Sequence, residues 1–509
     1  MLHKELKIVM LSVCTLFFLH TGSAQKLITY EAGMGTRRPD NSDVWILYQK
    51  VKAEHEGMYL YADSALLNNK QNDFTAYRNI KIIIDDTTTI VGDSMYYDGL
   101  SKIVNIWADT VVFTSGKTIL TTPQLSYDRN INRATYFWWG HTVNGNRTLD
   151  SHKGYYFSDS EDFEIYEDVV LCDTSSKLIT DTLYYNMKTS DAIFVSPTTI
   201  YSDSTTIYSE NGTYNTETRQ SESYKGSKVI TGTKVLTGDT LYFDDIKRYG
   251  KAYGDVCIAD TANLVTCIGN YGETDQKERY SFVTDSALVV QVDKKKQTDT
   301  LYMHGDSIYV FNNSDNKAEI LRAFYHVKVY RNDCQGMCDS ANYWVADSML
   351  TLYVEPVLWY NDMQCTSDTI VATLNADGLK LVNMMQNSML IEQLDNDRFN
   401  QVKGKRIDVY FAKGKPTYSD ILSNAQMCYY ITEDDTVRHT KSLIGVNAGV
   451  SNDMRVYFAN NEPQRIAAFG TPDMQTYPVN QLPEEWRRLK GFNWMMAKRP
   501  KVWQDVFKQ

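Results

Sequence analysis

A short pattern of polar and apolar positions recurs along the chain. Its clearest copy is Gly92-Asp93-Ser94-Met95-Tyr96-Tyr97: a small residue, an aspartate, a hydroxyl residue, and apolar residues at the fourth and sixth positions. Further copies occupy residues 62–67, 180–185, 238–243, 284–289, 298–303 and 305–310. Side chains alternate between two faces along a β-strand, so the fourth and sixth residues share one face. The pattern therefore predicts strands with one apolar face.

The apolar positions form a stripe that we take as the candidate binding residues. Its members are Met95, Tyr97, Leu183, Tyr185, Leu241, Phe243, Leu301 and Met303. Ser94, Thr182 and Thr240 are expected on the other face. The stripe has two interpretations: the wall of an open groove, or the core of a closed solenoid with the Asp–Ser/Thr step as a corner. In an open groove, Leu241→Asp is expected to remain hydrated and to leave the fold intact.

The aspartates of the pattern recur about every thirty residues. Asp63 and Asp93 are 30 residues apart, and Asp339 and Asp368 are 29 apart, whereas Asp285 and Asp306 fall out of phase. Second strand-like segments, such as residues 103–107 and 322–330, lie between the copies, and no segment with helical periodicity intervenes. The sequence predicts an all-β repeat of about thirty residues per unit, interrupted by loops of variable length.

The first residues have the order of a secretory signal. Lys4 and Lys7 precede an apolar run over residues 8–19, and Gly22-Ser23-Ala24 supplies small residues for cleavage after Ala24. The run is shorter than the ~20 residues of a membrane-spanning helix. We therefore expect an exported protein without a helical anchor.

The expected organisation has four parts. Residues 1–24 are the signal peptide, 25–380 the β-repeat region, 381–480 a degenerate continuation of it, and 481–509 a tail. In the tail, Pro483 and two glutamates precede two arginines and Gly491, the pattern of a short helix. The tail is interpreted either as a helical cap on the last repeat or as a docking segment.

Composition and motifs narrow the function. A net charge of −11 argues against a nucleic-acid partner. The counts of 36 Tyr, 27 Gly and 10 Pro favour strands. The eight histidines are scattered, and no metal-protease, nucleophile-elbow or complete phosphate-loop motif occurs. We therefore expect no enzyme activity, no cofactor and no metal site.

The cysteines do not suggest a disulfide scaffold, because seven is an odd and sparse number for the exported part. Two pairs are close enough in sequence to be considered as bridges. Cys334 and Cys338 flank a predicted turn, and Cys257 and Cys267 would face each other across a hairpin over residues 258–266.

The pattern of small residue, Asp, any residue, apolar, any residue and Tyr or Phe, followed by a strand such as residues 252–256, resembles the repeat of the OstA-like (organic solvent tolerance) family. That family includes the periplasmic bridge protein of lipopolysaccharide transport and the soluble domain of the outer-membrane translocon. The resemblance covers about residues 45–375 well and the rest loosely.

The resemblance implies an elongated, V-shaped β-jelly roll, or β-taco, that holds the lipid A acyl chains of lipopolysaccharide on its apolar inner face. It further implies a periplasmic location, association with the outer membrane, and transport components of the inner and outer membranes as partners. It leaves end-to-end self-association open. The alternative is a structural or adhesive closed β-solenoid with no lipid ligand.

Overall fold

The fold is all-β, as the sequence predicts. The computed structural model describes residues 26–292, 300–435, 440–459 and 461–508. Strands account for 71% of the residues and helices for 3%. The predicted signal peptide lies outside the described residues. Within them, no helix has both the length and the hydropathy needed to cross a membrane.

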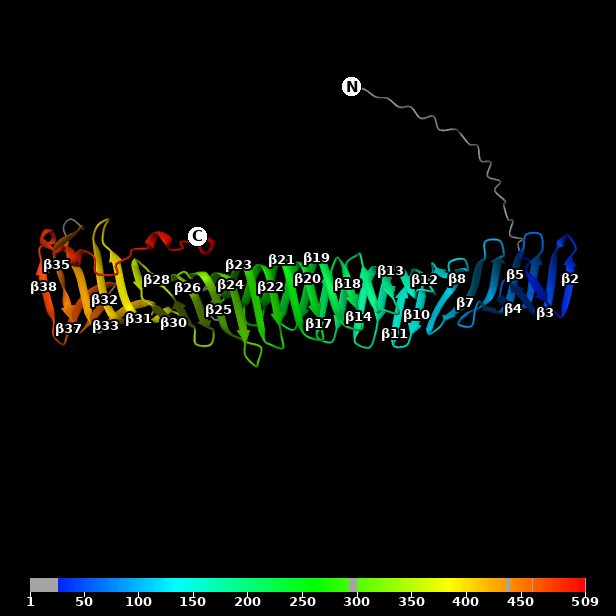
Figure 1. Cartoon of the computed structure of the whole chain (residues 1–509), viewed down its shortest axis with the longest axis horizontal. Helices are drawn as coiled ribbons and strands as arrows, with labels where there is room; N and C mark the ends of the chain where they lie inside the picture. The colour runs from blue at the N-terminus through cyan, green and yellow to red at the C-terminus, as the bar shows by residue number, and fades with distance from the viewer. Residues whose placement is uncertain (1–25, 293–299, 436–439, 460, 509) are drawn as a thin grey trace, which may run out of the picture. The chain divides into compact units, whose positions relative to one another are not determined.

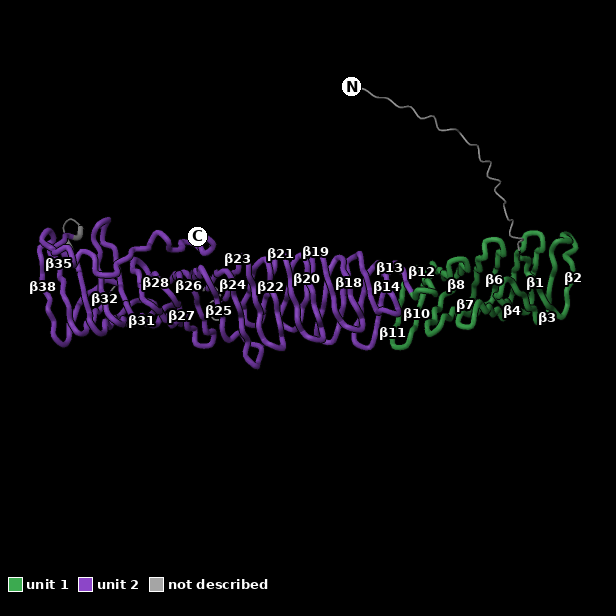
Figure 2. Tube along the Cα trace, viewed as in Figure 1, with its two compact units in different colours: residues 1–161 green, residues 162–509 purple. Residues whose placement is uncertain are grey.

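The chain divides into two compact units, residues 1–161 and 162–509 (Figure 2). The strands of the first unit are β1 (Thr29–Glu31), β2 (Met34–Arg38), β3 (Asn41–His55), β4 (Met58–Asn68), β5 (Asp73–Ile83), β6 (Thr88–Asp98), β7 (Ile103–Ser115), β8 (Thr118–Asp128), β9 (Arg133–Tyr136), β10 (Gly140–Asn144), β11 (Arg147–Ser151) and β12 (Lys153–Phe157). From β3 to β8, each strand pairs antiparallel with the next one along the chain.

The second unit continues the same pattern of antiparallel pairing (Figure 1). Its strands up to residue 330 are β13 (Asp162–Cys172), β14 (Ser176–Asn186), β15 (Asp191–Phe194), β16 (Thr198–Ser202), β17 (Thr205–Ser209), β18 (Asn211–Asn215), β19 (Gln220–Thr231), β20 (Lys234–Asp244), β21 (Tyr249–Asp260), β22 (Val265–Asp275), β23 (Tyr280–Val292), β24 (Thr300–Asn312) and β25 (Ala318–Tyr330).

The remaining strands are β26 (Gln335–Trp344), β27 (Met349–Tyr353), β28 (Val357–Tyr360), β29 (Met363–Thr366), β30 (Thr369–Asn375), β31 (Gly378–Gln393), β32 (Phe399–Ala412), β33 (Lys415–Leu422), β34 (Ala425–Asp435), β35 (Thr440–Ser451), β36 (Asp453–Ala459), β37 (Glu462–Phe469) and β38 (Asp473–Tyr477). The tail holds four short helices: η1 (Val479–Gln481), α1 (Glu484–Arg487), η2 (Met496–Lys498) and η3 (Trp503–Phe507).

Most long strands bend near their middle. In the β5–β6 pair, Tyr77 lies opposite Ser94 but Ile80 lies opposite Gly92, so two residues of β5 face Asp93 alone. Those two residues, at 78 and 79, have φ of 64° and 51°. Extra residues in one strand bend it and increase its twist. We call this bend the corner and the half-strands on its two sides the arms.

Paired left-handed residues recur at other corners. They lie at residues 49–50, 167–168, 225–226, 285–286, 325–326 and 386–387. Each bend folds the sheet over, so that the apolar faces of the two arms meet. This is the two-armed β-taco form of jelly roll that the resemblance implies.

The Asp–Ser/Thr step lies at the corner of several alternate strands, among them β4, β6 and β20, and just before β30. Asp63 accepts a 2.7 Å hydrogen bond from the left-handed Asn79 of the next strand, and Asp368 accepts bonds from Asn387 in the same way. The small residue before the aspartate fits a close approach, because a Cβ at Gly92 would lie 2.7 Å from Ile106. The repeated phrase is therefore explained by the geometry of the bend.

The tail lies on the second unit, not across the free edge of its last strands. Among the described strands, β37 pairs only with β36 and β38 only with β35. Leu489 packs with Met389, Ile391 and Phe399 on the outer face of β31 and β32. At this place four consecutive β31 residues, 388–391, are buried. Strands buried on both faces lose their alternation.

Candidate functional site

The eight stripe residues all lie in the interior between the arms. None is more than 5% exposed, and Tyr97, Leu183, Leu241 and Met303 are fully buried. Cross-strand neighbours extend the apolar surface: Leu183 lies opposite both Ile165 and Phe194. Ser94, Thr182 and Thr240 occupy the alternate, outer positions, where Ser94 and Thr182 are half-buried and Thr240 is exposed.

Leu301 and Met303 lie in the interior but on the other arm. In β24 the corner is at Asp306, between the paired positions His304 and Ser307, so the two residues precede the bend. Ile308 and Val310 follow it, and they are the counterparts of Met95 and Tyr97. The phrase at 305–310 contained this information, whereas the preceding phrase at 298–303 had the wrong phase.

Three interior tyrosines place their rings inside and bond polar groups with their hydroxyls. The Tyr97 hydroxyl lies 2.7 Å from Nδ1 of His55. The Tyr185 hydroxyl lies 3.2 Å from Oγ1 of Thr216. The Tyr136 hydroxyl bonds Oγ of Ser151 at 2.6 Å, and burial raises the pKa of Tyr136 to about 12. Such side chains suit a boundary that is apolar on one side and polar on the other.

Opposite the corner, the strand-connecting turns of the two arms meet along a line that we call the mouth. In the first unit, Arg129 from one arm donates to the backbone oxygens of His55 and Glu56 from the other. Lys102 and Glu56 form an ion pair of 2.6 Å between the same arms. Together with the contact between Tyr97 and His55, these bonds join the two arms at this part of the mouth.

In the second unit, a buried carboxylate closes the mouth. Asp245 is 3% exposed and follows β20 on one arm. Ser202 and Thr205 of the other arm each donate a 2.7 Å hydrogen bond to it. Arg219 and Arg248 form ion pairs with it at 2.9 and 3.3 Å. The cluster joins side chains of both arms around one charge.

The interior is closed in this structure. The expectation that an aspartate at 241 would remain hydrated is wrong, because Leu241 is 0% exposed. A cavity of about 40 Å³ does lie between the arms near the end of the second unit. Its apolar lining includes Leu390, Met427, Val456 and Ile466. A benzene-sized ligand occupies an apolar cavity of about 150 Å³, so an acyl chain requires the arms to separate further.

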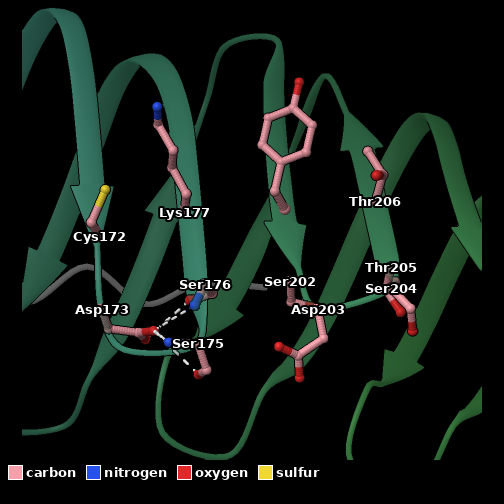
Figure 3. A pocket seen from close by; sticks show the side chains of 11 residues that line it. Cys172, Asp173, Ser175, Ser176, Lys177, Ser202, Asp203, Ser204, Thr205 and Thr206 are labelled. Atoms are coloured by element: carbon pink, nitrogen blue, oxygen red, sulfur yellow. Dashed lines mark hydrogen bonds between the residues drawn. The ribbon is translucent and has the colours of Figure 1, made fainter.

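A larger surface cleft, of about 600 Å³, is polar (Figure 3). It lies between the turn after β13 and the turn after β16. Serine and threonine residues at these turns line much of it: Ser175, Ser176, Ser202, Ser204, Thr205 and Thr206. Asp173 is occupied locally, since it accepts bonds from the backbone and side chains of Ser175 and Ser176. None of the stripe residues lines this cleft, and its polar lining does not suit acyl chains.

Neither of the considered cysteine bridges is compatible with the fold, and all four thiols are free. The expected β21–β22 hairpin forms, but Cys257 lies opposite Ile268 and Cys267 opposite Ile258. Adjacent residues point to opposite faces, so the sheet separates the two sulfurs. Cys334 and Cys338 are joined by extended strand β26, which separates them by roughly 13 Å, whereas bridged Cα atoms lie about 4.4–6.8 Å apart.

Within the described residues, no group of three or more His, Cys, Asp or Glu side chains is arranged to hold a metal ion. The site is therefore characterised by its apolar interior, the corner and the polar contacts of the mouth.

Comparison with known proteins agrees with the repeat. The model of the OstA-like protein family matches residues 28–176 and 163–239. Among solved structures, the chain is similar to LptH from Pseudomonas aeruginosa, described as the LptA homologous periplasmic component of the lipopolysaccharide transport device. The two share 16% identity with a TM-score of 0.21, over 24% of this chain and 82% of that chain. No curated protein matches the chain.

Proposed function

We propose that this chain, whose residues 28–239 match the OstA-like family model, is a periplasmic, non-enzymatic protein that binds lipopolysaccharide on the way to the outer membrane. The acyl chains of lipid A would lie between the two arms, and the sugars would remain in water. Its partners would be the lipopolysaccharide-transport components of the two membranes.

The observation that carries this proposal is the apolar interior within each unit, because it is made by the positions that define the family-like repeat. Met95, Leu183 and Leu241 follow a corner aspartate by two residues, and all are buried. An acyl chain can replace apolar side-chain contacts at little cost, since both are hydrocarbon. The interior is therefore a suitable environment for lipid once the arms separate.

The mouth is where the arms would separate. At the corner, the two arms are joined by continuous backbone, whereas at the mouth they are joined by side-chain contacts such as those of Asp245 and Arg129. Net contributions of about 1–3 kcal/mol for a hydrogen bond to a charged group are small enough for a bound amphiphile to offset. The lipid would enter sideways through the mouth, with its polar part outside.

Co-purification tests the proposal. The mature protein, purified from an envelope that contains lipopolysaccharide, is expected to retain lipopolysaccharide that mass spectrometry of the protein fraction detects. The control is the same protein carrying Thr182→Asp and Thr240→Asp on the outer face, which should retain lipopolysaccharide as the wild type does. Wild-type protein that never carries lipid would favour the structural or adhesive alternative, which the fully buried interior fits equally well.

A further inference from the structure

The tail that follows β38 is held in a defined position on the outer face of one arm. Three buried glutamines from different strands bond it in turn. Gln401 of β32 donates to the backbone oxygen of Arg487 and accepts from the backbone NH of Leu489, at 2.9 and 2.8 Å. Gln364 of β29 makes the same pair of bonds with Asn493 and Met495, at 2.6 and 2.7 Å.

Further contacts continue this attachment to the end of the tail. Arg499 donates to the side-chain oxygen of Gln335 on β26 at 2.7 Å. The Trp503 ring stacks on Tyr302 of β24, with centroids 5.1 Å apart and an interplanar angle of 14°. Figure 1 shows the tail running back from β38 along the second unit. These contacts determine which side of the tail faces the strands, and they therefore also determine which side faces solvent.

The solvent side of the tail is basic, in a chain with a net charge of −11. Residues 481–508 contain three acidic side chains, Glu484, Glu485 and Asp505. They contain seven basic ones: Arg487, Arg488, Lys490, Lys498, Arg499, Lys501 and Lys508. The charge of this segment is thus opposite to that of the whole protein.

Several of these cations have no carboxylate partner among the described residues. Arg487 and Lys508 form ion pairs within the tail, with Glu484 and Asp505. Lys490, Lys498 and Lys501 are exposed, and no ion pair joins them to a described carboxylate. An unpaired, exposed group of cations is what an anionic surface attracts.

Two other features favour a surface over a small anion. The Arg488 guanidinium lies over the rings of Phe399 and Phe492, 4.4 and 4.6 Å from their centroids. It also donates to the backbone oxygens of Arg487 and Asp397, so its charge is held in a fixed position without a carboxylate partner in the described part of the chain. Val502, Trp503 and Phe507 are 50%, 36% and 41% exposed at the end of the same segment. Exposed aromatic residues beside lysines are typical of segments that lie in a membrane interface.

We propose that the solvent side of residues 487–508 docks on an anionic phospholipid surface. Each lysine or arginine near such a leaflet contributes about a fivefold factor in binding, so Arg488, Lys490, Lys498 and Lys501 together supply several hundredfold. The glutamine contacts hold the tail so that these charges act together. This proposal does not rest on the lipid-binding interior.

Vesicle flotation of the mature full-length protein tests it. We expect binding to vesicles of phosphatidylcholine mixed with phosphatidylglycerol, no binding to phosphatidylcholine alone, and release at high salt, because screening weakens surface attraction. The variant K490E/K498E/K501E should bind at least about hundredfold more weakly. The control K228E/K277E/K317E reverses three exposed lysines elsewhere on the same unit and should bind nearly as wild type.

Three results would overturn the proposal. They are equal weakening by both triple variants, binding that high salt does not reduce, and binding only to vesicles that contain lipopolysaccharide, which would assign the cations to that lipid's phosphates. Both variants are expected to unfold at the same temperature as the wild type, because the substitutions are exposed. A thermal unfolding measurement with this result shows that any loss of binding comes from charge and not from misfolding.

Discussion

The corner and the mouth close the same interior by different means. At the corner the backbone itself passes from one arm to the other, with left-handed residues such as Asn79 at the bend and an aspartate such as Asp63 bonded to them. At the mouth the arms are joined by side chains, with Asp245 buried among donors from both arms. The difference indicates a hinge on one side and a releasable closure on the other.

The largest effect is expected inside the interior that both edges enclose. Leu241→Asp places a carboxylate where the leucine is fully buried, so the lipid-free protein should lose about 3–5 kcal/mol of unfolding free energy. Urea unfolding measures the loss. Thr240→Asp, one residue away on the outer face, is the matched control and should change stability by less than about 0.5 kcal/mol. Equal losses at the two positions would contradict the assignment of faces.

A substitution at the mouth should lower the free energy of unfolding by less than one in the interior, and it should also increase solvent access to the turns of the mouth. Asp245→Asn removes the charge that Arg219 and Arg248 contact and should cost about 2 kcal/mol. If the mouth is the releasable closure, amide hydrogen exchange should accelerate in the turns at residues 202–205 and 244–249. The corner residues 238–239 should be unaffected. Faster exchange at the corner instead would reverse the roles of the two edges.

The corner should respond least, and mainly through the backbone. Asn79→Ala loses the hydrogen bond to Asp63 and must still adopt a φ of 51°. This left-handed conformation costs about 1 kcal/mol for a non-glycine residue without a polar side chain. Asn79→Gly loses the same bond but tolerates the angle. Denaturant unfolding should therefore rank the alanine variant below the glycine variant. Equal destabilisation by the two variants would mean that the lost hydrogen bond, and not the left-handed backbone angle, sets the cost.

Much of this organisation could be predicted from the sequence, because the repeated phrase encodes local geometry. The alternation that puts Leu183 inside and Thr182 outside, and the corner at the Asp–Ser/Thr step, follow from strand periodicity and turn chemistry. The phase at Leu301 and Met303 could not be decided, because two copies of the phrase follow each other closely there and only pairing selects Asp306 as the corner.

The contacts between distant segments could not be predicted. His55 and Tyr97 are 42 residues apart, and Gln364 and Met495 are 131 apart. No periodicity links such positions, so the mouth contacts and the course of the tail depend on tertiary packing. The cysteine pairs failed for a related reason, since a register offset of one residue places Cys257 and Cys267 on opposite faces.

The most direct test of the lipid-binding interior is site-specific photo-crosslinking in cells that make lipopolysaccharide. A photo-reactive residue at Leu183 or Leu241, inside the arms, is expected to capture lipopolysaccharide, whereas one at Thr182 or Thr240, on the outer face, should capture none. Capture on both faces alike, or on neither, would contradict the account that the interior between the arms carries the acyl chains.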